Sequence, residues 1–208
     1  VLAVQNTHQM WTGSSNKNEI TWDILQLDKD GKLTNGYWDN SKSQWIDESV
    51  YGIKSIAAYE SLFNEDLNGD GYLGVRFEDL DISTTDVTGA QLARDKTGGL
   101  YIVHTDKSIK AISNAGWLEY DYGWGQKRQA VALEEETSNG NITGYRVALK
   151  NTSTQWDGTT NVTWDVMYLD STGKLTYGFW DAATNQWRDE SIYGAKSIAP
   201  NESMFNQD

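Results

Sequence analysis

A long internal repeat constrains this chain more than any other feature of its sequence. Residues 21–66 align with residues 163–208 without a gap at an offset of 142 positions, and 28 of the 46 aligned positions are identical. Upstream, LAVQNT at 2–7 matches VALKNT at 147–152. The repeated unit is about as long as a small domain, well beyond the roughly 20–50-residue periods of solenoids. The sequence therefore indicates tandem duplication of a domain-sized unit.

The stretch between the two matching segments, residues 67–144, occurs only once. Residues 1–66 are accordingly predicted to be the C-terminal half of one repeat unit. Residues 67–208 are predicted to be one complete unit that ends inside the next acidic motif. We expect the chain to be a segment of a longer array. The alternative is that the parent protein simply ends at this point.

Composition excludes several classes of protein. The chain has 17 Lys and Arg against 30 Asp and Glu, a net charge of −13, which argues against nucleic acid as a partner because phosphates attract clustered basic residues. Its apolar runs are far shorter than the roughly 20 residues that span a bilayer, so no membrane insertion is expected. With no Cys, disulfides and thiolate metal sites are excluded. An aromatic content of 12% indicates a folded chain rather than a disordered acidic one.

Short β-branched and apolar runs separated by turn residues predict a mainly β fold built from hairpins. Strand–turn–strand patterns occur around Gly31 and Gly173, where a hairpin loop favours a left-handed residue, and again at 92–103 and 136–150. Residues 54–66 and 196–208 are expected to hold only short helical turns. The predicted fold is a set of hairpin-rich tandem repeat units, with these turns near an Asp-rich calcium loop.

The acidic motif D-x-N-x-D-G at 66–71 points to calcium. Calcium binds six to eight oxygen atoms, and alternate acidic and amide side chains on a tight loop supply them. Asp66, Asn68 and Asp70 are the predicted side-chain ligands, and Tyr72 offers its backbone carbonyl. The alternative is an ordinary turn on an acidic surface.

The helix–loop–helix calcium pattern is not complete. Its twelfth position calls for a bidentate Glu, and that position here is Phe77. Glu78 and Asp79 follow directly and are predicted to close the calcium shell in a different geometry. The similar turn LDKDGKL at 27–33 is assigned no metal, because its counterpart at 169–175 replaces Asp30 with Thr172.

Several of these motifs together resemble a known family. The run GYRVALKN at 144–151, the following Trp-Asp strand and Asp-x-x-Gly-Lys turn, and above all FNEDLNGDGYLG at 63–74 are similar to the tryptophan-rich C-terminal domain first described in Synechocystis. That resemblance implies large, repetitive, secreted or cell-surface bacterial proteins, and hence an extracellular location, and it supports calcium at Asp66, Asn68 and Asp70. It implies no reaction.

Two pairs of tryptophans bracket polar loops in the repeated segments. Trp38 and Trp45 flank one loop, and Trp180 and Trp187 flank its counterpart. Because sugar rings stack on aromatic faces, these four residues are candidate carbohydrate-binding positions, with a glycan or cell-surface polysaccharide as partner. The alternative is that the paired tryptophans brace their hairpins.

No catalytic constellation is apparent. The only two histidines lack a companion at metal-ligand spacing, and among 30 acidic residues some carboxylate pair is always available. We therefore predict a protein that is not an enzyme. Two readings remain: a calcium-binding extracellular module for adhesion or glycan binding, whose tandem units give avidity, or a calcium-stiffened structural spacer whose partners are neighbouring repeats of the same protein.

Overall fold

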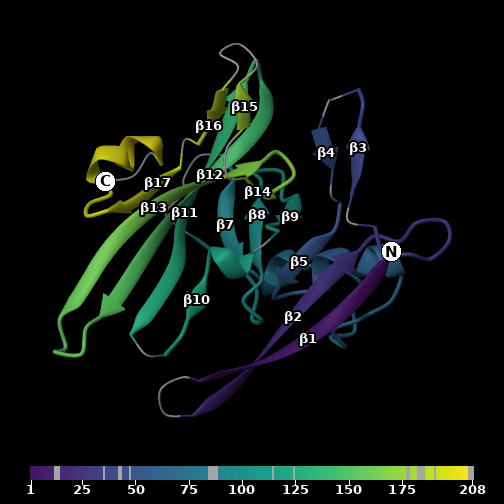
Figure 1. Ribbon diagram of the computed structural model, residues 1–208, viewed down its shortest axis with the longest axis horizontal. Helices are drawn as coiled ribbons and strands as arrows, with labels where there is room; N and C mark the ends of the chain where they lie inside the picture. Colours follow the sequence, from purple (N-terminus) through teal and green to yellow (C-terminus); the bar gives the residue numbers. More distant parts are fainter. Residues whose placement is uncertain are drawn as a thin grey trace.

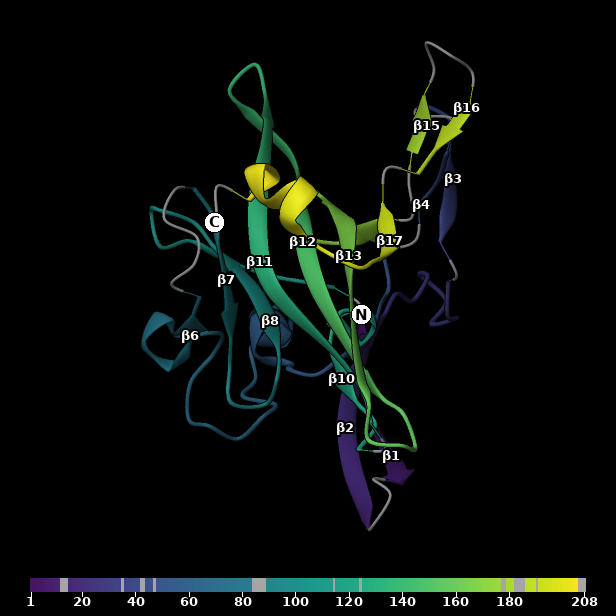
Figure 2. The ribbon, with the colours of Figure 1, turned by 90° about the vertical axis from the view of Figure 1, so that its left-hand side faces the viewer.

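The computed structural model describes residues 1–11, 15–34, 36–41, 44–46, 48–83, 89–113, 115–123, 125–176, 179–181, 186–189 and 191–205 (Figures 1 and 2). Its strands form antiparallel sheets, and its helical segments are short, so the predicted mainly β class is confirmed. Among the described residues, no helix has the length and apolar character needed to cross a lipid bilayer.

The largest sheet is built on three long strands, β11 (Gln126–Ser138), β12 (Asn141–Thr154) and β13 (Thr160–Asp170). β11 and β12 are joined by Asn139 and Gly140, which both have positive φ, as a two-residue hairpin turn requires. Three short strands complete this sheet: β10 (Tyr120–Asp121), β14 (Leu175–Thr176) and β17 (Ile192–Ala195).

A four-stranded sheet lies beside β11 in both views (Figures 1 and 2). It is formed by β6 (Asp81–Ile82), β7 (Gln91–Arg94), β8 (Leu100–Val103) and β9 (Ile109–Ala111). Every residue of β8 is buried, because this strand packs on both faces. The largest core cluster joins the two sheets and includes Leu92, Leu100, Ile102, Val147, Leu149, Met167, Leu169 and Leu175.

The N-terminal part forms a separate three-stranded sheet in the order β1 (Leu2–Trp11), β2 (Asn16–Leu25) and β5 (Val50–Ile53). Two helical turns follow it, η1 (Ala57–Tyr59) and α1 (Glu60–Phe63). Ile24, Ile53 and Ile56 form a second core between this sheet and the helical turns. The remaining short elements are β3 (Tyr37–Asp39), β4 (Gln44–Ile46), η2 (Phe77–Asp79), η3 (Ala115–Trp117), β15 (Phe179–Asp181), β16 (Gln186–Arg188) and η4 (Ala199–Met204).

The two similar sequence segments form strands with the same pairings. Trp22 pairs with Ile53 in β2 and β5, and Trp164 pairs with Ala195 in β13 and β17, so both partners move by 142 positions. β1 and β12 also correspond. Leu2 pairs with Leu25, and Val147 pairs with Met167, the equivalent of Leu25. Leu2 therefore corresponds to Val147, and the offset along these two strands is 145.

The two segments differ in what surrounds their hairpin turns. Gly173 has φ +85°, and the backbone N–H of Ser113 donates to its carbonyl at 3.0 Å. The equivalent Gly31 has φ +77° and no neighbour within 4 Å of where a Cβ would stand. At Gly173 an added Cβ would lie 2.7 Å from the carbonyl oxygen of Ala111.

This difference gives a matched pair of substitutions. Both Gly31→Ala and Gly173→Ala place alanine in the left-handed region, at about 1–2 kcal/mol each. Gly173→Ala also forces the turn away from β9, so we expect it to lower the free energy of unfolding by about 1–3 kcal/mol more than Gly31→Ala. Urea denaturation of the two variants measures this difference, and equal losses would contradict the close packing of the second turn.

Candidate functional site

The acidic loop 66–74 follows the helical turns of the N-terminal part and is ordered by its own side chains. Asp66 Oδ1 accepts hydrogen bonds from the backbone N–H groups of Gly69 at 2.7 Å and Asp70 at 3.2 Å, and its Oδ2 accepts one from Gly71 at 2.8 Å. Gly69 and Gly71 both have positive φ, a conformation that glycine adopts without steric cost. The backbone of the loop thus folds around the Asp66 carboxylate.

The next two predicted ligands continue the same pattern. Asn68 Oδ1 accepts from the N–H of Asp70 at 2.8 Å, and Asp70 Oδ1 accepts from the N–H of Tyr72 at 2.9 Å. Asn68 Nδ2 also donates to Asp70 Oδ2 at 3.2 Å. The structure therefore brings four of the six predicted metal residues together in one tight, exposed loop.

Glu60 anchors this loop from beneath and was not predicted from the sequence. Its side chain is fully buried at the start of α1. Oε1 accepts from the N–H groups of Leu67 and Asn68, both at 3.0 Å, and Oε2 accepts from Gly74 at 3.0 Å. The only signal in the sequence was that position 60 and its equivalent, position 202, are both Glu.

The other two predicted ligands lie on η2. Asp79 is ion-paired with Arg76, whose Nε donates to its Oδ2 at 2.5 Å, and the Arg76 guanidinium lies 3.8 Å from the centre of the Tyr72 ring. Glu78 is exposed. Within the described ranges, no three His, Cys, Asp or Glu side chains are grouped in a way that could hold a metal. The assignment of Glu78 and Asp79 to a calcium shell stays a prediction.

A cavity of about 260 Å³ separates the acidic loop from the turn after β7. Residues that line it include Ser55, Asn68, Asp70, Arg76, Asp79, Asp95 and Lys96. Burial opposes the ionisation of Asp95, but hydrogen bonds from Ser55, Tyr101, Thr97 and Gly99 outweigh it and hold the pKa of Asp95 below its ordinary value. Asp95 therefore keeps its charge beside the cavity.

The tryptophan pairs lie on two short hairpins that project from the sheets (Figure 1). The Cα atoms of Trp38 and Trp45 are partners in β3 and β4, and those of Trp180 and Trp187 are partners in β15 and β16. The Trp38 side chain is 55% exposed. The side chains of the other three lie outside the described part of the structure, so their assignment to sugar stacking stays a prediction.

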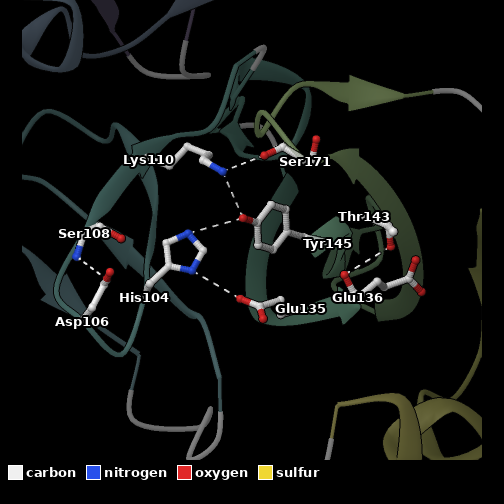
Figure 3. A network of polar contacts seen from close by, with 9 residues as sticks. All are labelled: His104, Asp106, Ser108, Lys110, Glu135, Glu136, Thr143, Tyr145 and Ser171. Carbon is white, nitrogen blue, oxygen red and sulfur yellow. Dashed lines mark hydrogen bonds and ion pairs between the residues drawn. The ribbon is translucent and has the colours of Figure 1, made fainter. Parts of the chain in front are cut away.

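A chain of polar contacts links the two packed sheets (Figure 3). His104 Nδ1 lies 3.2 Å from Glu135 Oε2, and its Nε2 lies 3.3 Å from the Tyr145 hydroxyl. Lys110 Nζ donates to the same hydroxyl at 3.2 Å and to the carbonyl oxygen of Ser171 at 2.6 Å. These residues come from the end of β8, from β9, β11 and β12, and from the turn after β13. The arrangement satisfies polar groups between two sheets and holds those sheets together.

We compared the chain with protein-family models, with curated protein sequences and with solved structures, and none of the three comparisons found a match. What the acidic loop offers is a set of oxygen atoms on a backbone that is already ordered.

Proposed function

We propose that this chain is a calcium-binding extracellular repeat module of a bacterial surface or secreted protein, serving adhesion or glycan binding. The observation that carries this proposal is the ordered acidic loop, in which Asp66, Asn68 and Asp70 alternate along a backbone held by the buried Glu60. An ordered loop loses less conformational entropy when it binds an ion, which favours affinity.

The donor set of the loop suits calcium. Its side-chain donors are the carboxylates of Asp66 and Asp70 and the amide oxygen of Asn68, and calcium prefers oxygen ligands of these kinds. A carboxylate has about four acceptor positions in total. The three N–H groups that bond to Asp66 and the two donors that bond to Asp70 therefore leave acceptor capacity on both groups. The carbonyl of Tyr72 and water are expected to supply the remaining ligands.

Calcium titration tests the metal directly. Isothermal titration of the chain with calcium should give one saturable site, and the melting temperature should rise with calcium, because a ligand that binds only the folded state stabilises it by mass action. Asp70→Asn keeps an acceptor for the Tyr72 N–H but removes a charge, so we expect calcium affinity to fall about tenfold or more, since affinity depends on the number of charged ligands.

The exposed hairpin turn of the N-terminal sheet provides a matched control. Asp30 lies in a turn of similar sequence, and its carboxylate contacts the neighbouring Lys29. Asp30→Asn removes the same charge from the same half of the molecule and should leave calcium affinity unchanged. An absence of calcium binding at millimolar concentration, or equal losses in Asp30→Asn and Asp70→Asn, would refute the site.

Adhesion requires a ligand, and the tryptophan hairpins are the proposed contact. A glycan array probed with the chain in calcium and again in chelator should give hits that weaken when Trp38 is replaced by alanine. Trp156, an exposed tryptophan at the turn between β12 and β13, supplies the control, and Trp156→Ala should bind as the unmodified chain does. Glycan binding that survives Trp38→Ala unchanged would remove that hairpin from the proposal.

A second candidate, the structural spacer, is favoured by the way the N-terminal part docks on the rest. Lys54 Nζ donates to the carbonyl oxygen of Glu119 at 3.3 Å, and Tyr59 hydrogen-bonds Ser113. These contacts join the segment before the acidic loop to the residues on either side of η3, so a metal in that loop would stiffen the junction. A folded chain that binds calcium but no glycan would favour this function.

A further inference from the structure

The N-terminal sheet exposes an apolar face that its counterpart buries. We define the open face as Leu2 and Val4 of β1, Leu25 of β2, and Leu27 and Leu33 beyond it; strand register places all five on one side, because Leu2 pairs with Leu25 and Leu27 with Leu33. At the offsets given above, their equivalents in the C-terminal sheet are Val147, Leu149, Met167, Leu169 and Leu175.

All five residues of the open face are less buried than their equivalents: Leu2 and Leu33 are exposed and the other three are half-buried, whereas all five equivalents are buried. Leu33 is 60% exposed whereas Leu175 is 4% exposed, and Leu2 is 43% exposed whereas Val147 is fully buried. The C-terminal set is covered by the segment 89–134, which contributes Leu92, Leu100, Ile102, Ile112 and Leu118 to the main core. We call residues 89–134 the covering segment. The covering segment therefore fits the C-terminal face, which is the equivalent of the open face.

The pairing of the strands is a second, independent difference between the two sheets. β12 lies between β11 and β13, whereas the equivalent β1 pairs with β2 alone and is an edge strand of the described sheet (Figure 1). In the part of the chain that the structure describes, the N-terminal sheet has no strand equivalent to β11. An unpaired edge ten residues long invites pairing with another strand.

A charge difference marks the same site. In the C-terminal sheet, Arg128 of β11 donates from Nε to Asn151 Oδ1 at 2.7 Å and from Nη2 to Asp165 Oδ2 at 2.6 Å. The equivalent pair in the N-terminal sheet is Asn6 and Asp23, and there Asn6 Nδ2 donates directly to Asp23 Oδ2 at 2.9 Å. In the described part of the chain, no cationic side chain contacts Asp23. The open face thus presents a carboxylate where an incoming β11 equivalent would bring its arginine.

We propose that the open face docks a second copy of the covering segment, supplied by another repeat unit, whose β11 equivalent pairs with β1 and whose Arg128 equivalent meets Asp23. A second molecule of this chain does not supply that copy, because its own covering segment is already packed on its C-terminal sheet. The inference rests on the repeat part of the proposed function and is independent of calcium.

The test extends the chain so that the missing segment is present. Residues 67–145 are repeated directly before Val1, so that the added Tyr145 precedes β1 as Tyr145 precedes Arg146 in the original chain. Hydrogen exchange is measured on both chains in chelator, which separates this test from any failure of the calcium proposal. We expect the β1 amides that face away from β2 to exchange at least about tenfold more slowly in the extended chain, because they become hydrogen-bonded within a sheet.

Two variants of the extension serve as controls. Leu100→Asp and Ile102→Asp together, made only in the added copy, place charges where the apolar contact is proposed and should abolish the protection. Arg128→Met in the added copy should reduce it. The proposal is overturned if β1 exchanges equally fast in the extended chain, whether the added segment folds elsewhere or stays unfolded beside the open face. It is also overturned if the doubly charged variant protects β1 equally, or if the original chain dimerises and protects β1 by itself.

Discussion

Replacing Arg128 with methionine is expected to lower the free energy of unfolding by about 3–5 kcal/mol, because it leaves a buried carboxylate without its partner. Asp165 is buried in β13, and its Oδ2 receives the Arg128 guanidinium at 2.6 Å while its Oδ1 accepts from Gly194 at 2.7 Å. Methionine keeps much of the apolar stem of arginine but none of its charge. Urea denaturation followed by tryptophan fluorescence measures the loss.

A double-mutant cycle separates this ion pair from packing. With Asp165→Asn already present, Arg128→Met should cost much less, because no buried charge is then left unpaired. The N-terminal sheet supplies the control: Asp23→Asn, which removes the equivalent carboxylate where no arginine contacts it in the described structure, should cost about 1 kcal/mol or less. A loss below about 1 kcal/mol for Arg128→Met alone would show that the pair is not what stabilises this part of the sheet.

Glu60→Ala is expected to destabilise the fold by about 3–5 kcal/mol, because three part-buried backbone N–H groups lose their buried acceptor and an unpaired donor shielded from water costs about 1–3 kcal/mol before the loop relaxes. The loss should appear in urea denaturation. In hydrogen exchange the amides of Leu67, Asn68 and Gly74 should lose protection first, since these are the groups that Glu60 accepts from. Calcium affinity should also fall in Glu60→Ala, because the loop is no longer held in one conformation.

The repeat again supplies the comparison. Glu202 is the equivalent of Glu60, is half-buried, and receives no hydrogen bond on its side chain from the described residues. Glu202→Ala should therefore change stability by no more than about 0.5 kcal/mol, as should Glu65→Ala at an exposed position nearby. Similar losses in Glu60→Ala and Glu202→Ala would mean that the buried carboxylate does not order the acidic loop.

Much of the fold was predictable, because hairpin patterns are local. The turns at Gly31 and Gly173 and the hairpin of β7 and β8 follow from glycine and aspartate placed between short, largely apolar runs. The same local logic placed Asp66, Asn68 and Asp70 on one loop, because side chains two residues apart on a tight turn bond to the next backbone N–H groups. Arg76 and Asp79 are also only three residues apart, but their pairing depends on the helical turn η2, which the sequence pattern did not predict.

The amino-acid sequence by itself determined the β class, the similarity of the two segments and the turn residues of the acidic loop, because each depends on residues close together in the chain or on direct comparison of two segments. The tertiary structure alone decided what each segment buries. Leu33 and Leu175 sit in nearly identical sequences, yet only Leu175 is covered, because residues 89–134 pack on the second sheet. Glu60 likewise has the sequence character of a surface residue, but in the folded chain the acidic loop covers it. Burial depends on contacts between distant parts of the chain, and local sequence does not record those contacts.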